Sequence, residues 1–411
     1  MKKIGIIGTG IAGLTSAYYL SRHHDITVFE ANNYIGGHTH TIDVELNGEQ
    51  SAIDTGFIVF NDRTYANFIR LLDEIGVHYQ PTEMSFSVRN DAIGLEYNGH
   101  GLNSLFAQRK NLINAAFLRM LYDIMRFNRS VKQISPALQA KTIGDFLDDN
   151  SFGELFTNNY LLPMVAAIWS MGLDEIRAFP LQFFTRFFEN HGLLDIINRP
   201  QWYSIIGGSR SYIEPLTAPF THAIRLSSPV QSLARGKEGI TLTSNSVEET
   251  YDEIIVACHG DEALDMLVDP SELEQQILGS FKFTDNDVIV HTDTTRLPQA
   301  KKAWASWNYR INSDISSQAT LTYNMNILQR LEKRHTYLVT LNEEVADDKV
   351  LARFTYAHPV YNNEVIEAQE RWGDISGVNH IHYCGAYWLN GFHEDGVRSA
   401  LRVCQALGVT P

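Results

Sequence analysis

Apolar residues at the start of the chain follow two kinds of spacing in turn. The run KIGII at residues 3–7 is nearly continuous in apolar residues, which is typical of a buried strand. After GTGIAG, apolar residues recur at helical spacing through LTSAYYLSRH, and a second β-rich run, DITVFE, ends at Glu30. This order predicts a strand, a helix and a second strand, and such βαβ units imply a parallel sheet.

The pattern changes again further along the chain. Residues 101–151 carry apolar side chains at helical spacing, at Leu112, Ala116, Phe117, Met120, Leu121, Ile124 and Phe127. Short strands return between residues 205 and 257, where IRLSSPVQSLA and GITLTS predict antiparallel pairs. A second β-rich block runs from DVIVHTD to YLVTL, and the chain ends on an amphipathic helix that begins near residues 391–396.

We therefore predict an α/β protein with two domains that exchange the chain several times. The Rossmann-like domain that contains the βαβ unit is assigned residues 1–84, 204–278 and 376–411, and a mixed α+β substrate domain is assigned residues 85–203 and 279–375. At 411 residues the chain is long enough to form two cores of ordinary size.

Three glycines form the sequence GxGxxG between the first strand and the first helix. Gly8 allows a tight turn, Gly10 lets the backbone approach a pyrophosphate, and Gly13 lets the helix pack closely on the strand. Ile11 and Ala12 open the helix, whose free N–H groups and positive dipole end attract phosphate. In this βαβ context a dinucleotide site is favoured over a purely structural glycine turn.

Glu30 supports the same interpretation. It ends the second strand 17 residues after Gly13, where a carboxylate accepts hydrogen bonds from ribose hydroxyls. A carboxylate at this place also disfavours the 2′-phosphate of NADP.

The residues after Glu30 discriminate between FAD and NAD. The run EANNYIGGHTHT contains Ala31 and the pair Gly36 and Gly37, and it resembles the E-A-x-x-x-x-G-G-R sequence of the flavin amine oxidase superfamily. That superfamily includes monoamine oxidases, protoporphyrinogen oxidase and phytoene desaturases. There the glycine pair lets a second loop close on the FAD pyrophosphate. His38 stands where the superfamily usually has arginine, so a fixed charge is replaced by a titratable one.

Four later stretches resemble the same superfamily. DTGFIVF resembles the superfamily's strand beside the flavin ring, and the Pro-Val pair in IRLSSPVQSL resembles its adenine contact. IIVACHG resembles the strand that abuts the cofactor, and YCGAYWLNGFHEDGVRSALRV resembles the closing FAD segment. The resemblance implies FAD contacts at Gly56, Phe57, Ile58, Val230, Gly385, Phe392, His393 and Glu394. No cysteine stands at the superfamily's covalent-flavin position near residues 356–358, so the resemblance implies non-covalent FAD.

Four stretches are similar to a narrower group within this superfamily. They are NHGLLDIINRPQW (190–202), GGSRSY (207–212), WASWNY (304–309) and GFHEDG (391–396). The group comprises uncharacterised bacterial amine-oxidase-like proteins, often found beside cyclopropane-fatty-acid-synthase-type methyltransferases. The resemblance implies a lipid methyltransferase as a partner and moves the expected substrate from amines towards acyl chains.

Three side chains are candidates for catalysis near the flavin. The superfamily typically holds a lysine near the reactive nitrogen through a water, and Lys282 lies in the expected half of the substrate domain. His291 lies on a predicted strand of that domain, and His259 follows a buried strand. Each has a structural alternative, since lysines are usually solvated and a lone histidine is as often a core residue.

Composition limits the possible partners. A formal net charge of −15 argues against nucleic-acid binding, which needs a basic face, and favours a small-molecule or apolar substrate. The cysteines Cys258, Cys384 and Cys404 are odd in number and lack CxxC spacing, so no disulfide framework or metal site is indicated, and a cytoplasmic location is expected. No apolar run reaches the roughly 18 residues of a membrane-spanning helix.

One segment differs from the acidic average. Residues 105–133 contain six basic residues and a single acid, Asp123, on an apolar helical pattern. Two hypotheses follow: peripheral contact with anionic lipid, or a solvated face that pairs with acids elsewhere.

The sequence therefore predicts an FAD-dependent oxidoreductase that removes hydride from a small or lipid-like substrate, as an oxidase or desaturase. Three alternatives stay open. They are an amine oxidase that releases hydrogen peroxide, a flavin isomerase or mutase with no net redox change, and a non-catalytic FAD-binding partner of a lipid methyltransferase.

Overall fold

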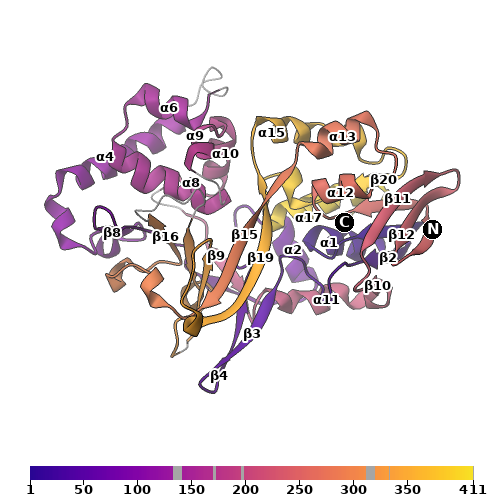
Figure 1. Cartoon of the computed structure of the whole chain (residues 1–411), viewed down its shortest axis with the longest axis horizontal. Helices are drawn as coiled ribbons and strands as arrows, with labels where there is room; N and C mark the ends of the chain where they lie inside the picture. Colours follow the sequence, from indigo (N-terminus) through magenta and orange to yellow (C-terminus); the bar gives the residue numbers. More distant parts are fainter. Residues whose placement is uncertain (133–140, 170–172, 196–198, 312–319, 333, 411) are drawn as a thin grey trace.

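The computed structural model describes residues 1–132, 141–169, 173–195, 199–311, 320–332 and 334–410. The chain forms an elongated molecule with two lobes (Figure 1). Two long antiparallel strands, β15 (Lys282–His291) and β19 (Val350–Val360), run side by side between the lobes. The predicted α/β class is confirmed, whereas the positions of the domain boundaries stay predictions.

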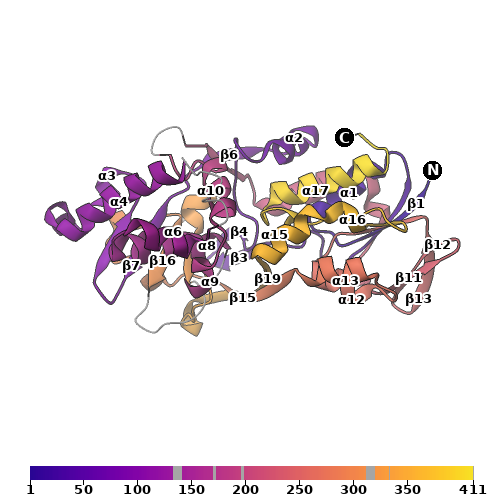
Figure 2. The ribbon, with the colours of Figure 1, turned by 90° about the horizontal axis from the view of Figure 1, so that it is seen from above.

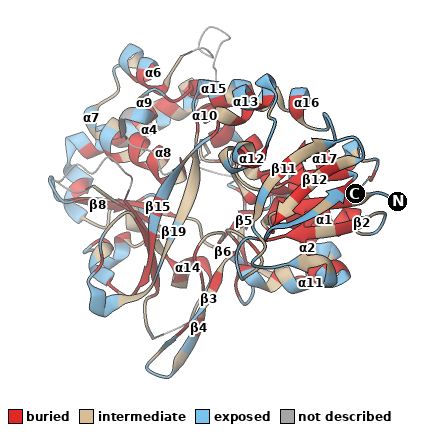
Figure 3. Cartoon of the chain, turned by 45° about the vertical axis from the view of Figure 1, so that its right-hand side comes forward, coloured by how far each residue is buried: buried red, intermediate tan, exposed pale blue. Residues whose placement is uncertain are grey.

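A five-stranded parallel sheet forms the centre of one lobe. Its order is β10 (Ile224–Arg225), β2 (Asp25–Phe29), β1 (Lys3–Ile7), β14 (Glu253–Val256) and β20 (Ile381–Tyr383). All neighbouring pairs are parallel, which confirms the predicted βαβ unit. These strands and the helix after β1 are largely buried (Figure 3), as expected for a parallel sheet covered on both faces.

Two helices from opposite ends of the chain pack against each other beside this sheet. They are α1 (Ile11–Leu20) and α17 (His393–Ala406). A side chain at Gly396 would place its Cβ 2.6 Å from Ile11 Cγ2, so this glycine permits the close contact. The N-termini of both helices consequently lie near each other.

The strands between residues 224 and 256 differ in part from the prediction. β11 (Val230–Gly236), β12 (Gly239–Ser244) and β13 (Val247–Tyr251) form the expected antiparallel sheet. Ile224 and Arg225, predicted to belong to it, instead pair in parallel with Val28 and Phe29 at the edge of the central sheet. Two residues are too few for apolar alternation to reveal which sheet a strand joins.

The second lobe is built on a seven-stranded sheet. Its order is β19, β15, β18 (Leu338–Leu341), β17 (Leu321–Asn324), β16 (Trp307–Ile311), β7 (Phe86–Asn90) and β8 (Leu95–Asn98), and only β16 and β7 pair in parallel. The helices of this lobe lie together at one end of the molecule (Figure 2). They are α3 (Leu102–Leu105), α4 (Ala115–Val131), α6 (Ile143–Asn150), α7 (Glu154–Phe156), α8 (Leu162–Trp169), α9 (Leu173–Arg177) and α10 (Leu181–Asn190). The predicted helical region 101–151 is thus confirmed within the described residues, outside which residues 133–140 lie.

The remaining elements connect or cover these parts. β3 (Thr41–Leu46) and β4 (Glu49–Asp54) form a hairpin, and β5 (Phe60–Asn61), β9 (Trp202–Ile205) and β6 (Tyr79–Thr82) form a small sheet. Further helices are α2 (Ala66–Glu74), α11 (Ile213–Thr217), α12 (Gly260–Met266), α13 (Glu272–Gly279), α14 (Met325–Leu328), α15 (Asn363–Glu370) and α16 (Trp372–Ile375). Among the described residues, no helix combines the length and apolarity needed to cross a bilayer.

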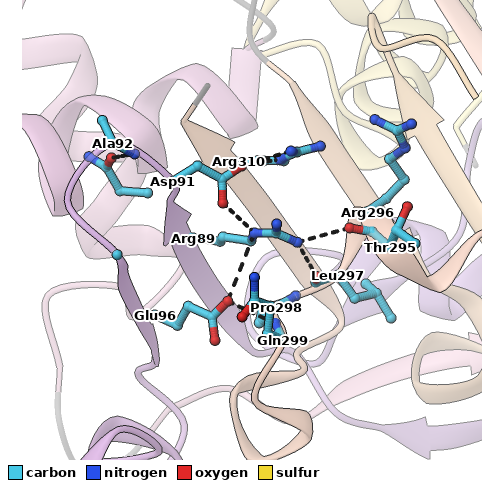
Figure 4. A network of polar contacts seen from close by, with 12 residues as sticks. Arg89, Asp91, Ala92, Glu96, Thr295, Arg296, Leu297, Pro298, Gln299 and Arg310 are labelled. Carbon is cyan, nitrogen blue, oxygen red and sulfur yellow. Dashed lines mark hydrogen bonds and ion pairs between the residues drawn. The ribbon is translucent and has the colours of Figure 1, made fainter. Parts of the chain in front are cut away.

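Charged side chains connect β7 and β16, two neighbouring strands of the seven-stranded sheet (Figure 4). Arg89 of β7 and Arg310 of β16 are direct neighbours in the parallel register, so their charges repel. The Asp91 carboxylate accepts hydrogen bonds from both guanidinium groups, at 2.6 and 2.8 Å. Arg89 also donates to the backbone oxygens of Thr295 and Leu297, which joins β7 to the connection between β15 and β16.

Asp91→Asn should therefore lower the free energy of unfolding by about 1–2 kcal/mol, because two neighbouring arginines lose their shared counter-charge. Urea unfolding followed by circular dichroism measures this. Asp348→Asn removes a far more exposed carboxylate whose pair with Lys349 is 3.5 Å long, and it should have little effect. Equal losses in the two variants would contradict the assigned role of Asp91.

Candidate functional site

The first glycine turn is shaped by three different constraints. Gly8 has φ +101°, a left-handed conformation that favours glycine. A side chain on Gly13 would place its Cβ 2.0 Å from the Gly8 carbonyl oxygen. At Gly10, by contrast, no atom lies within 4 Å of the place where Cβ would stand. Gly13 therefore permits helix packing, while Gly10 borders open space at the N-terminus of α1, where Ile11 and Ala12 are buried.

A second glycine loop lies over this turn. The Gly36 N–H donates to Thr9 Oγ1 at 3.2 Å. A Cβ on Gly37 would lie 3.2 Å from the Gly10 Cα, so the two loops touch at Gly10. The residues predicted to enclose a pyrophosphate are thus brought together.

Glu30 is held at the same edge of the sheet. Its carboxylate accepts hydrogen bonds from the backbone N–H groups of Thr9 (3.0 Å) and Asn32 (2.8 Å). The Glu30 carbonyl oxygen accepts from the Ser228 N–H at 2.8 Å, which brings the segment leading to Val230 beside it. The neighbouring Ala31 is exposed.

Histidine and aromatic side chains form a layer between the second loop and β19. His40 Nδ1 lies 2.8 Å from the Tyr356 hydroxyl. The rings of His38 and Tyr356 are 5.2 Å apart, and those of His38 and His358 are 6.0 Å apart. His259 completes the layer, with its ring 6.2 Å from that of His38.

Two histidines of this layer, His38 and His358, are neutral near neutral pH. Removal from water, with repulsion from His358 and His259, lowers the pKa of His38 to about 3. Burial likewise lowers the pKa of His358 to about 4. His38 therefore provides no positive charge for a phosphate, unlike the arginine found at this position in the resembling superfamily. Among the described residues, no three or more His, Cys, Asp or Glu side chains are placed to hold a metal ion.

Phe57 and His393 meet next to this layer. Phe57 lies in the connection between β4 and β5, not in the strand that the resemblance implied. A Cβ on Gly56 would lie 2.3 Å from the His38 carbonyl oxygen, so this connection passes close to the second loop. The Phe57 and His393 rings stack, with centroids 3.5 Å apart and an interplanar angle of 8°. His393 Nε2 lies 3.0 Å from the hydroxyls of both Thr39 and Tyr212. Ile58, the next residue along, is a core residue.

The acidic residues at the start of α17 act as helix caps. Asp395 accepts from the Phe392 N–H of its own helix at 3.0 Å. Glu394 instead accepts from the Phe68 N–H at 2.9 Å and from Asn67, and so caps α2. Burial raises the pKa of the Asp395 carboxyl to about 6. The backbone at His393 opens the helix, where the first N–H groups have no intrahelical partner.

Phe392 and Gly385 take further positions around this helix. The Phe392 ring packs on that of Phe187 from α10, with centroids 5.1 Å apart, so α17 contacts the second lobe here. The Gly385 N–H donates to Ser399 Oγ on α17 at 2.9 Å, and a Cβ on Gly385 would strike the Tyr387 ring at 2.5 Å.

A cavity of about 350 Å³ opens beside Phe392. It is also lined by His191, Tyr65, Glu189, Arg63 and Arg398. His191 Nδ1 lies 2.9 Å from the Phe187 carbonyl oxygen and donates to it, so Nε2 is an acceptor. Burial lowers the pKa of His191 to about 4, so this ring is neutral near neutral pH.

Of the three catalytic candidates, only His259 lies in the histidine layer. Its ring stacks on Phe283 at 4.1 Å. Because successive side chains on a strand point to opposite faces, the adjacent Lys282 points away from His259, and its side chain is exposed. His291 is nine residues further along β15, about 30 Å of strand.

His291 is a structural core residue. It is fully buried, Nε2 contacts Thr340 Oγ1 at 2.6 Å, and Nδ1 accepts from the Asp293 N–H at 3.0 Å. The structure therefore does not support the assignment of His291 or Lys282 as catalytic groups.

Some residues of the site were not predicted from the sequence. For Tyr356 and His358, the resemblance implies only that no cysteine is present for a covalent flavin bond. The available signal was their alternation with Phe354 on one strand face, matched by His38 and His40 two residues apart in the second loop. Residues 196–198 of the stretch 190–202, and Gln133 at the end of the basic segment, lie outside the described residues.

The fold and this arrangement of two glycine loops, a carboxylate and two helix N-termini are those of the dinucleotide-binding class of proteins. Residues 11–302 match the family model described as flavin containing amine oxidoreductase. The chain belongs to this family, which confirms the resemblance found in the sequence. The proposed association with cyclopropane-fatty-acid-synthase-type methyltransferases stays a prediction.

Individual relatives agree with the family. A protein of Mycobacterium tuberculosis named as a flavin-containing monoamine oxidase is 24% identical over 267 residues, which is 61% of this chain and 56% of that protein. The chain thus matches little more than half the length of this relative.

Solved structures show the same fold across the whole chain. Cyclohexylamine oxidase from Brevibacterium oxydans has a TM-score of 0.71 at 15% identity, with 99% of this chain and 98% of that chain covered. A fatty acid isomerase from P. acnes that produces CLA has a TM-score of 0.69 at 14% identity, with 99% of both chains covered.

The buried His291 predicts a pH-dependent stability. Burial lowers its pKa to about 4, whereas an unfolded histidine titrates near about 6.5. Between these values the unfolded state binds more protons, so the free energy of unfolding decreases as the pH falls, by about 2 kcal/mol between about pH 7 and about pH 5. His291→Gln should reduce this dependence by that amount in urea titrations, and the exposed His222→Gln should not. An unchanged pH slope in His291→Gln would contradict the prediction.

Proposed function

We propose that this chain binds FAD non-covalently and uses it to remove hydride from a lipid-like substrate. The observation that carries the cofactor assignment is the open space at Gly10, bordered by Gly37 and the N-terminus of α1. Flavin is the cofactor of the family, and the residues present fit a dinucleotide there. A backbone without side chains allows close approach, and unpaired N–H groups favour phosphate.

Other residues are assigned to the ribose, the adenine and the flavin ring of the cofactor. Glu30 is placed to accept hydrogen bonds from a ribose, in exchange for those it now receives from Thr9. The backbone near Val230 supports an adenine contact, because it follows the segment bonded to Glu30. The first N–H groups of α17, at His393 and Glu394, supply positive dipoles for the flavin ring.

Two glycine variants separate cofactor binding from folding. Gly10→Ala adds a methyl group at a position that meets no neighbouring side chain or loop within 4 Å, so the fold should persist while FAD affinity falls about 10- to 100-fold. Gly13→Ala should instead lower the free energy of unfolding by about 1–3 kcal/mol, because its Cβ meets the Gly8 oxygen. Fluorescence titration with FAD and thermal unfolding measure the two effects.

Gly99→Ala is the matched control for Gly10→Ala, because its Cβ also meets no atom within 4 Å. It should bind FAD as the unmodified chain does. Full FAD affinity in Gly10→Ala would overturn the placement of the cofactor.

For the reaction, bound flavin supplies a hydride acceptor for a substrate C–H bond. The chain supplies orientation and a site that excludes water. The neutral side chains of His38 and His358, and the stacked rings of Phe57 and His393, place no positive charge beside an apolar substrate. By their positions, His259 and His191 are the candidates for a side chain that moves a proton in this reaction.

The cavity beside Phe392 favours a lipid-like substrate over a cationic amine. Two of its carboxylates, Glu394 and Asp395, already accept backbone N–H groups and are removed from water. The third carboxylate that lines the cavity, Glu189, is exposed to solvent. Arg63 and Arg398 also line this cavity, each 3.7 Å from a carboxylate, that of Asp195 and that of Asp395. Beyond these ion pairs, the two guanidinium groups place positive charge where an anionic head group would be attracted.

Two relatives keep other reactions open as rivals. The mycobacterial relative is named as a monoamine oxidase, and one structural neighbour is a fatty acid isomerase. An isomerase would convert an unsaturated acyl chain with no net electron acceptor, whereas an amine oxidase would release hydrogen peroxide. A non-catalytic FAD-binding partner of a lipid methyltransferase would bind FAD and convert nothing.

Anaerobic mixing of the FAD-loaded protein with a substrate panel distinguishes these cases. We expect loss of flavin absorbance near 450 nm, on the order of the full oxidised band, with acyl chains and not with mono- or polyamines. Bleaching by amines alone would identify an amine oxidase. Product formation from an unsaturated fatty acid without net bleaching would identify an isomerase, and no change with any compound would favour the non-catalytic role.

A further inference from the structure

The exposed side of residues 102–132 combines apolar and basic side chains; we name it the basic–apolar face. Its apolar members are Leu102, Leu112, Ile113, Leu118, Tyr122 and Met125. These six are among only fourteen large apolar side chains that are exposed in the described part of the chain. Ile113 is 89% exposed and Leu102 is 77% exposed, so little of either side chain contributes to the core.

Five of the apolar members lie just before α4 or along it. Leu112 and Ile113 protrude just before α4, and Leu118, Tyr122 and Met125 continue along the helix at spacings of four and three residues. The opposite side of α4 packs in the core through Phe117, Met120 and Phe127. The core of this chain therefore buries the apolar side chains on the inner side of α4. Those on its outer side have no such packing partner among the described residues.

The charge of this face is opposite to that of the whole chain. Residues 102–132 contain six basic residues and one acid in a protein of formal charge −15. That acid, Asp123, is 1% exposed and pairs with Arg126 (3.2 Å) and Arg119 (3.7 Å). Positive charge thus reaches the surface on the same side as the protruding apolar residues, as at Lys110 and Arg129.

Two properties favour an anionic membrane as the occupant. Apolar side chains bordered by lysine and arginine match the boundary between acyl chains and anionic head groups. A second copy of the chain would place the same basic residues opposite each other in a two-fold interface, which is repulsive.

We propose that the basic–apolar face holds the protein on an anionic lipid surface, with Leu112 and Ile113 entering the interface and α4 lying along it. The face is at the end of the molecule opposite both chain termini (Figures 1 and 2). Binding here needs no flavin and no turnover, so this inference stands or fails separately from the proposed function.

Sedimentation of the full chain with vesicles tests the proposal. The protein should bind vesicles of phosphatidylcholine mixed with phosphatidylglycerol and not vesicles of phosphatidylcholine alone. Binding should be lost when salt rises from about 0.1 M to about 1 M, because the screening length falls from about 10 to about 3 Å.

Matched pairs of variants locate the contact. Lys110→Gln with Arg129→Gln should weaken binding about 25-fold, at about fivefold per basic residue. Lys237→Gln with Lys349→Gln, which removes two exposed lysines elsewhere, should change it less than about twofold. Leu112→Ser with Ile113→Ser should weaken binding about tenfold or more, unlike Val247→Ser with Val268→Ser.

Three results would overturn the proposal. The first is no binding to anionic vesicles, and the second is an equal loss of binding in the test and control variants. The third is self-association that Leu112→Ser with Ile113→Ser abolishes while vesicle binding is absent, which would assign the face to a second copy. Circular dichroism of each variant checks that the helices remain folded.

Discussion

The close approach of α1 to the end of β1 is the constraint on which the candidate site depends. A Cβ at Gly13 would lie 2.0 Å from the Gly8 oxygen, so only glycine lets the helix begin here. Gly396 then allows α17 to pack on α1. Two helix N-termini from opposite ends of the chain consequently meet near the carboxyl ends of one parallel sheet, which is where doubly wound folds bind dinucleotides.

The second lobe contributes to this edge through two long strands. β15 begins beside the glycine loops and β19 ends beside them, and both strands belong to the seven-stranded sheet. β19 places Tyr356 and His358 against the loop that contains His38. His38 and His358 are neutral near neutral pH, because burial suppresses their protonation. Phosphate charge would then be balanced by helix dipoles and N–H groups rather than by a side chain at position 38.

Local sequence signals predicted the βαβ unit, the glycine loops and the closing helix, because each depends on residues a few positions apart. They did not predict that Glu394 caps α2 or that His291 is a bonded core residue, since both depend on partners distant in sequence. Edge pairing of Ile224 and Arg225 was missed because two residues carry no periodicity. The basic segment was visible in the sequence, but only the structure separates its exposed apolar side from its buried one.

Competition between ADP and FAD tests the central claim most directly, that the nucleotide half of the cofactor lies at the turn around Gly10. Calorimetric titration of FAD into the flavin-free chain should give one site per chain, and ADP should compete for it because the proposal assigns Gly10, Gly37 and Glu30 to that half of the cofactor. FAD binding that ADP does not affect, or no FAD binding by a folded chain, would contradict the account.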